Sequence, residues 1–140
     1  MAQSLTIESF PTSGPGVTAG GVAAVLRLEG GAALAASVIA YQAVGGDWWV
    51  FALLFLAPDI SMVGYLLNRR AGAFLYNLGH SYLTPAVLAL AAYLVEAPNL
   101  CPIALIWTAH IGFDRVLGYG LKYSAGFGVT HLGLKGRAAR

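Results

Sequence analysis

Four apolar stretches of roughly twenty residues follow one another along this chain, and they set the kind of fold that it can adopt. They cover residues 20–44, 48–67, 71–95 and 102–123, with turn-forming or charged residues between them. Hydrophobic residues make up 58% of the 140 residues and charged residues 10%, which is too apolar for an ordinary soluble domain. The sequence therefore predicts an all-α integral membrane protein, built as a bundle of four antiparallel transmembrane helices.

The flanking segments predict two tails around one membrane domain. Residues 1–18 are polar and lack the basic-then-apolar order of a cleaved signal peptide, so we expect a flexible tail. Residues 19–124 hold the predicted four-helix domain. Residues 125–140 are rich in glycine and end in the basic sequence KGRAAR, which predicts a second tail.

Positive charge gathers on one side of the predicted bundle. If all four stretches cross the membrane, the loops on one side hold only Asp47 and Glu96. The opposite side carries the basic residues Arg69, Arg70, Lys122, Lys135, Arg137 and Arg140. The positive-inside rule therefore predicts a multi-pass protein of the inner (plasma) membrane with both termini in the cytoplasm.

Composition also excludes several classes of protein. The net charge is only +2, and no basic patch with interleaved aromatic residues is present, which excludes a nucleic-acid partner. The single cysteine, Cys101, excludes an internal disulfide and a multi-cysteine metal site. The expected partners are the lipid bilayer and a lipophilic small molecule.

Ionisable residues within the apolar stretches mark the expected functional site. A charged side chain at the centre of a membrane helix costs about 2.5–3.5 kcal/mol, so several together predict a polar interior. Counted by helical rise, four of these residues lie at a similar depth on four different helices: Glu29, Asp59, His80 and Asp114. His110 lies one turn from Asp114 on the same face. The candidate catalytic residues are Glu29, Asp59, His80, His110 and Asp114.

A second set of residues predicts substrate contacts. The third stretch carries one continuous polar face at i, i+3, i+4 and i+7, formed by Asn77, His80, Ser81 and Thr84. A buried Arg115 must pair or meet an anionic ligand, and Tyr119 and Lys122 share its face. His131 either folds back over the cytoplasmic mouth or stays solvated. The candidate substrate-binding residues are Asn77, Arg115, Tyr119, Lys122 and His131.

Three kinds of chemistry fit this set of side chains, and the sequence leaves them open. Neutral imidazole and carboxylate oxygen suit a divalent metal such as Zn, Fe or Mn, with His80, His110 and Asp114 as ligands. The same groups suit metal-free acid–base catalysis. In the third alternative the cluster only fixes the packing, with Glu29 or Asp59 neutralising Arg115.

Several motifs carry a resemblance to a known family. They are RLEG at 27–30, WWVFALLFLAPDISMVGYL at 48–66, YNLGHSYLTP at 76–85, IWTAHIGFDRVLGYGLKY at 106–123 and THLG at 130–133. Over residues 24–134 the chain resembles the small bacterial integral membrane family catalogued as domain of unknown function 4260. The resemblance implies an integral membrane protein of a few helices and supplies no accepted activity.

The residues favour a membrane-embedded enzyme, a hydrolase, isomerase or cyclase, that acts on a lipophilic substrate. The alternatives are a protein that conducts protons or small ions and a non-catalytic protein that binds lipophilic molecules. Small residues off the polar stripe of the first helix, Gly30, Gly31 and Ala35, predict a homodimer through this helix or its neighbour. The alternative is that they pack the helix within its own bundle.

Overall fold

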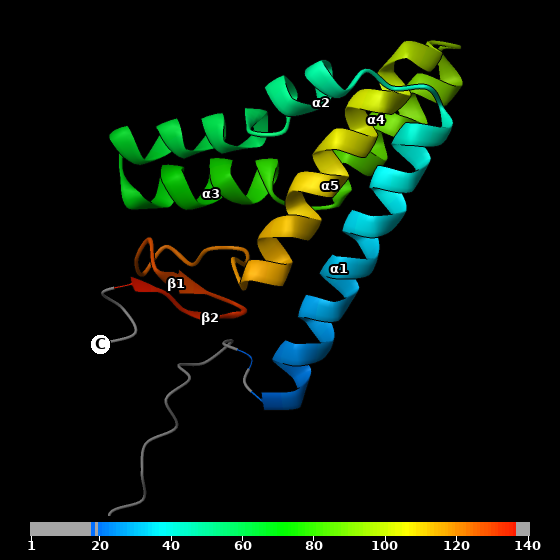
Figure 1. Cartoon of the computed structure of the whole chain (residues 1–140). Coiled ribbons are helices and arrows are strands. Elements are labelled where there is room, and N and C mark those ends of the chain that lie inside the picture. The colour runs from blue at the N-terminus through cyan, green and yellow to red at the C-terminus, as the bar shows by residue number, and fades with distance from the viewer. Residues whose placement is uncertain (1–17, 19, 137–140) are drawn as a thin grey trace, which may run out of the picture.

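The computed structural model of the chain describes residues 18 and 20–136, which form helices, their connecting loops and a short hairpin near the C-terminal end (Figure 1). Residues 1–17 of the predicted N-terminal tail and 137–140 of the predicted C-terminal tail lie outside the described part. The helices are α1 (Gly20–Ala43), α2 (Trp48–Leu54), α3 (Arg69–Gly79), α4 (Leu83–Leu94) and α5 (Cys101–Leu117), with 3-10 helices η1 (Ala57–Leu66) and η2 (Pro98–Leu100). Strands β1 (Val129–Thr130) and β2 (Gly133–Leu134) pair antiparallel as the C-terminal hairpin.

The core of the molecule is the antiparallel contact between α1 and α5, with α4 also packed on α5 (Figure 1). Glycines bring the two backbones together. A Cβ at Gly30 would lie 2.3 Å from the Cβ of Arg115, and one at Gly112 would lie 2.6 Å from the Gly30 carbonyl oxygen. Absent side chains at these two positions therefore permit the close approach of the helices.

The predicted outward position of Gly30 is wrong. Gly30 is buried against α5, because α1 turns its Gly30, Ser37 and Tyr41 side toward that helix. A Cβ at Gly31 would also lie 3.5 Å from Val116 of α5, whereas Ala35 is exposed. The two glycines therefore pack α1 within its own chain, and the homodimer stays a prediction.

The second and third apolar stretches are each interrupted. Pro58 occupies the first turn of η1, where its missing N–H and fixed φ end the α-helical geometry of α2 and start a 3-10 helix. The third stretch divides into α3 and α4 at residues 80–82, so the prediction of one helix over 71–95 is wrong. The hydroxyl of Ser81 accepts from the backbone N–H of Leu83, and that of Thr84 donates to the Leu78 carbonyl. The predicted polar face thus satisfies backbone groups at a helix break.

The helices η1 and α3 lie side by side as an arm that projects from the α1–α5 pair (Figure 1). Glycines again allow the contact. A Cβ at Gly64 would lie 3.0 Å from the Ala71 carbonyl oxygen, and one at Gly79 would lie 2.8 Å from Ser61 Oγ. The arm and the α1–α5 pair meet at Asp59 and His80, the beginning of η1 and the end of α3.

The helix α5 ends at Leu117, earlier than the predicted end at residue 123, because Gly118 adopts a left-handed conformation with φ of 82°. Its N–H donates to the Arg115 carbonyl, and that of Tyr119 donates to the Asp114 carbonyl, which closes the last turn. The chain then folds back beside the arm and forms the C-terminal hairpin.

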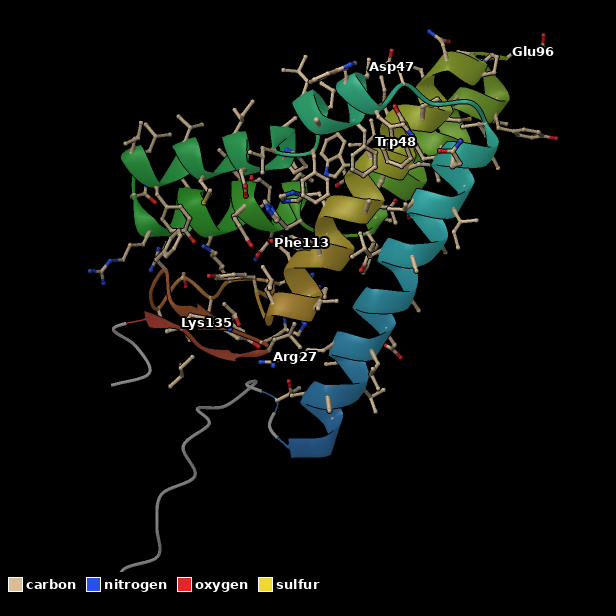
Figure 2. The ribbon with its side chains drawn as sticks, viewed as in Figure 1. Arg27, Asp47, Trp48, Glu96, Phe113 and Lys135 are labelled. Carbon is tan, nitrogen blue, oxygen red and sulfur yellow. The ribbon has the colours of Figure 1, made fainter. Side chains whose placement is uncertain are left out.

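The described residues contain three helical stretches that are long and apolar enough to cross a membrane. They are Gly20–Ala43, Trp48–Leu66 and Pro98–Leu117, and α4 is a shorter apolar helix. A four-helix transmembrane bundle is therefore not confirmed. Charge is sorted along the α1–α5 pair: Asp47 and Glu96 lie at one end, and Arg27 and Lys135 lie at the other (Figure 2).

Replacing Gly112 by alanine should destabilise the protein. The new methyl group would lie 2.6 Å from the Gly30 carbonyl oxygen and 2.8 Å from the Leu34 backbone nitrogen, and neither backbone atom can move aside alone. We expect a loss of about 1–3 kcal/mol, measured by thermal unfolding in detergent. Gly31→Ala is the matched control, because its Cβ meets only an ordinary 3.5 Å contact with Val116. Equal melting temperatures for the two variants would contradict this packing.

Candidate functional site

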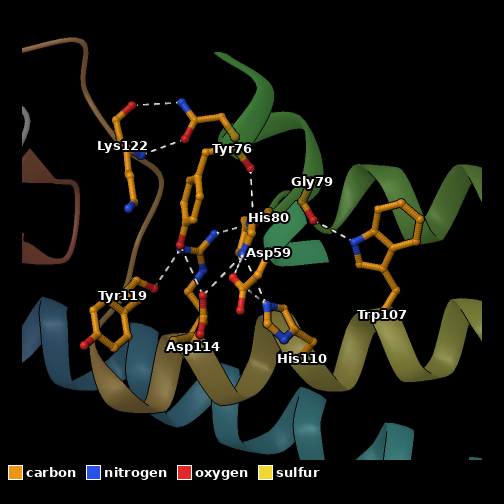
Figure 3. A network of polar contacts seen from close by, with 11 residues as sticks. Asp59, Tyr76, Gly79, His80, Trp107, His110, Asp114, Tyr119 and Lys122 are labelled. Atoms are coloured by element: carbon orange, nitrogen blue, oxygen red, sulfur yellow. Dashed lines mark hydrogen bonds and ion pairs between the residues drawn. The ribbon is translucent and has the colours of Figure 1, made fainter. Parts of the chain in front are cut away.

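Three side chains from separate elements converge where the arm joins α5 (Figure 3). Asp59 comes from η1, His80 from the residue that follows α3, and His110 from α5. The Nε2 atom of His80 lies 3.2 Å from Asp59 Oδ1 and 3.2 Å from His110 Nε2. His110 Nε2 lies 3.7 Å from the same Asp59 oxygen. We refer to these three residues as the histidine–aspartate cluster.

The burial of the cluster leaves one side open. His80 and His110 are almost fully buried, whereas the Asp59 side chain is 35% exposed. Helical rise placed Asp59 and His80 at the level of Glu29 and Asp114 and put His110 one turn further along, and the structure brings Asp59, His80 and His110 together. A reacting molecule would therefore approach the cluster from the Asp59 side.

Asp114, which the sequence predicted as a metal ligand together with His80 and His110, lies beside the cluster, and Asp59 takes its place among the three residues that could hold an ion. The Oδ2 atom of Asp114 is 3.6 Å from His80 Nε2 and accepts a hydrogen bond from the Tyr76 hydroxyl at 3.1 Å. The Tyr76 ring stacks on the His80 ring with centroids 3.8 Å apart. Tyr76 is not among the site residues that the sequence predicts, although its position four residues before His80 places it one helical turn away.

The orientation of the His80 ring is fixed by a hydrogen bond to the backbone. Its Nδ1 atom lies 3.0 Å from the Tyr76 carbonyl oxygen, which can only accept, so Nδ1 carries the proton. In the neutral ring, Nε2 then presents a lone pair toward the Asp59 carboxylate. A lone pair and a carboxylate at 3.2 Å require a proton or a cation between them. Metal-binding histidines commonly have this second hydrogen bond to a carbonyl.

The second histidine has one unsatisfied nitrogen. His110 Nδ1 is buried without a hydrogen-bond partner in the described structure, and the Phe55 ring meets the imidazole edge-on at 5.3 Å. Only Nε2 of this residue faces other polar groups. Both histidines therefore direct Nε2 toward the same point beside Asp59.

The helix break that delivers His80 is held from outside the arm. The Trp107 indole N–H donates to the Gly79 carbonyl at 2.6 Å, and Arg115 Nη2 donates to the His80 carbonyl at 3.0 Å. Both donors come from α5, which also carries His110. The helix α5 thus supplies His110 and also the groups that hold the backbone on either side of the other histidine.

The comparisons with known proteins identify the family. A family model described as domain of unknown function (DUF4260) matches residues 23–134. The chain belongs to this family. The match confirms the resemblance seen in the motifs and includes the histidine–aspartate cluster and Asp114. No curated protein and no solved structure matches the chain.

One predicted catalytic residue of this DUF4260 chain lies elsewhere. Glu29 is exposed on α1, so the expectation that it faces the interior is wrong. Its neighbour Gly30 occupies the position that meets α5, and the helical rotation between consecutive residues turns Glu29 away.

Arg115 binds backbone carbonyls. It is buried, and Nη1 donates to the Tyr119 carbonyl at 3.1 Å while Nη2 donates to that of His80. The guanidinium therefore links the α3–α4 junction to the segment after α5. Tyr119 contributes its carbonyl to this link, and its side chain is partly exposed.

Asn77 and Lys122 are brought together, but through the Lys122 backbone. The Asn77 side chain accepts from the Lys122 N–H at 2.6 Å and donates to the Lys122 carbonyl at 2.9 Å. The Lys122 ammonium lies over the rings of Tyr76 and Phe127, at 4.2 and 3.0 Å from their centroids. Burial lowers the pKa of Lys122 to about 8, although the Asp114 and Asp59 carboxylates act in the opposite direction.

His131 folds back, as one of the two sequence alternatives expected. Its Nδ1 accepts from the Leu121 N–H at 2.8 Å, and its carbonyl accepts from the Thr18 hydroxyl at 2.7 Å. Burial, and then the charge of Arg115, lower the pKa of His131. This residue therefore joins the C-terminal hairpin to the segment after α5 and to the residues before α1.

Replacing Asn77 by alanine should lower stability. The change leaves the Lys122 N–H and carbonyl without their partner, at a cost of about 1–3 kcal/mol. Thermal unfolding measures this loss, and Asn77→Asp should also lose stability, because it keeps the acceptor for the Lys122 N–H but sets a carboxylate oxygen against the Lys122 carbonyl. An Asn77→Ala variant with unchanged stability would contradict the structural role and favour the predicted substrate contact.

His131 should make stability depend on pH. Its pKa is lower in the folded chain than the ordinary value of 6.5, so the unfolded chain binds the proton more tightly. Stability is then complete above about pH 6.5 and falls as the pH decreases toward the folded pKa. His131→Gln should remove this component from the melting temperatures compared at about pH 8 and about pH 5. The buried His80 and His110 remain in both proteins, so an unchanged pH slope in the variant would exclude His131 as its source.

Proposed function

We propose that this protein is a membrane-embedded, metal-dependent enzyme that hydrolyses a lipophilic substrate. The observation that carries the proposal is the spacing of the three ligand atoms of the histidine–aspartate cluster. Bonds of about 2.0–2.2 Å to a tetrahedral ion place its ligand atoms about 3.3–3.6 Å apart. The three separations in the cluster are 3.2, 3.2 and 3.7 Å, close to the edges of one face of such a tetrahedron.

The donor set fits a catalytic ion. Two imidazole nitrogens and one carboxylate oxygen suit Zn, Fe or Mn, and three protein ligands leave a position for water. Such an ion lowers the pKa of bound water and polarises a carbonyl or phosphoryl oxygen. Asp114, next to His80, is the group placed to accept a proton, and the Tyr76 hydroxyl orients it.

Two apolar hollows support a lipophilic substrate. They have volumes of about 120 and 290 Å³ and share Ala57, Pro58 and Trp107 in their walls. Pro58 directly precedes Asp59, the exposed member of the cluster. No cluster residue lines either hollow, so the proposal places an apolar chain of the substrate against Pro58 and Trp107 and its ester or amide group beyond the hollow, toward Asp59.

The proposed orientation puts both chain ends on the cytoplasmic side of the inner membrane. Thr18, before α1, donates its N–H to the His131 carbonyl at 2.8 Å, so both ends of the described chain lie together. Arg27 and Lys135 lie at that end, and the acidic Asp47 and Glu96 lie at the opposite end (Figure 2). The positive-inside rule favours the basic end as the cytoplasmic one.

Elemental analysis of the purified chain tests the metal. We expect one Zn, Fe or Mn ion per chain, and we expect the Asp59→Asn variant to lose it. Asparagine has nearly the same size as aspartate and Asp59 is partly exposed, so the variant should still fold. Glu29→Gln is the matched control, because Glu29 is an exposed carboxylate outside the cluster. A wild-type protein without metal that also fails to take up added Zn would overturn the proposal.

Ion conduction is the other class of function, and a second measurement distinguishes it from the proposed enzyme. Proton flux in proteoliposomes that depends on Asp59 and needs no metal would replace the enzyme by a conducting protein. The exposed position of Glu29 removes one member of the polar chain that such a relay would use.

A further inference from the structure

A third, wider hollow lies between the outer end of the arm and the C-terminal segment. Its volume is about 830 Å³. Its walls combine aromatic rings with positive charge, and its principal side chains are Tyr65, Arg69, Tyr119, Phe127 and Lys135. We call it the basic hollow. It is separate from the two apolar hollows, with which it shares no lining residue.

The charge of the basic hollow is uncompensated. None of the described residues that line it is Asp or Glu. Within the described chain, no hydrogen bond or ion pair engages the exposed Arg69 guanidinium. Lys135 donates one hydrogen bond, to the Leu117 carbonyl at 2.8 Å, and an ammonium group has two further donors. An anion in the hollow would therefore meet free donors from both residues.

A third positive charge lies behind the aromatic wall. The Lys122 ammonium is 3.0 Å from the Phe127 centroid and 5.6 Å from that of Tyr65. It is buried, with 5% of its surface exposed, so its field is little screened by water. Lys122 adds to the attraction for an anion without needing to touch it.

Exposed apolar side chains continue from the hollow. Leu66 and Leu67, just before Arg69, are 83% and 77% exposed, and Phe127 in the wall is 55% exposed. A small soluble anion would leave these groups uncovered. An amphiphile would place its charged part between Arg69 and Lys135 and its hydrocarbon part along this apolar surface.

We propose that the basic hollow binds a phosphate-bearing anion, the headgroup of an amphiphile. Guanidinium and ammonium groups are the usual phosphate ligands, the first bidentate and the second as a point charge. The hollow lies beside segments apolar enough to enter a membrane, where lipid phosphates are abundant. The inference does not rest on the metal centre and would hold for a protein without catalytic activity.

Native mass spectrometry of the full chain in detergent tests the site with added phosphatidylglycerol. We expect one retained lipid per chain and about tenfold weaker retention in Arg69→Gln, the loss of one charge-assisted contact. Lys135→Gln should weaken it similarly. Arg70→Gln is the matched control, because this neighbouring exposed arginine does not line the hollow. Melting temperatures of all three variants verify that they are folded.

The outcomes separate the sources of the anion. Retention of phosphatidylglycerol that inorganic phosphate does not displace identifies a membrane lipid, whereas equal binding of inorganic phosphate identifies a soluble phosphate compound. Both support the site if Arg69→Gln weakens them and Arg70→Gln does not. Unchanged retention in Arg69→Gln, or equal loss in Arg70→Gln, would overturn the proposal. Metal content is measured independently, so failure here leaves the proposed function standing.

Discussion

The bond from the Arg115 guanidinium to the His80 carbonyl holds the rest of the site in place. It joins α5 to the point where α3 ends, and this is where His80 leaves helical geometry. Arg115 has no carboxylate partner among the described residues, and a buried cation needs strong acceptors, which the backbone carbonyls of His80 and Tyr119 provide. The same helix break would otherwise leave the His80 carbonyl unpaired in an apolar interior. The Arg115 guanidinium and the His80 carbonyl exposed at the helix break therefore satisfy each other's hydrogen-bonding capacity.

The histidine–aspartate cluster depends on two interruptions of helical structure. Pro58 lies in the first turn of the 3-10 helix η1, and Asp59 follows it in the same turn. Gly79, just before His80, permits the close contact of α3 with Ser61. Continuous helices would have separated these groups along two straight spans. A break in an apolar helix leaves backbone groups unpaired, and these groups need polar partners. The indole N–H of Trp107 is such a partner for the Gly79 carbonyl.

The sequence could predict which residues gather but could not predict how the chain bends to gather them. Helical rise and the positive-inside rule placed Asp59, His80 and Asp114 at one level with His110 one turn away, and the length of α1 agreed within a residue, because depth depends only on counting. The division at His80 was hidden because a polar stripe at helical spacing resembles a helix face equally well. Glu29 was misplaced for a different reason: only the contact with α5 reveals that a glycine, and not the adjoining carboxylate, is the interior position.

The 3-10 geometry of η1 has a mechanical consequence. Its ten residues extend about 20 Å at the 3-10 rise, whereas an α-helix of the same sequence would be about 15 Å long. Rewinding η1 would shorten it by about 5 Å and draw its outer end toward Asp59. Tyr65, near that end, lines the basic hollow. A change from 3-10 to α-helical rise in η1 would thus alter the distance between the basic hollow and the histidine–aspartate cluster without any hinge.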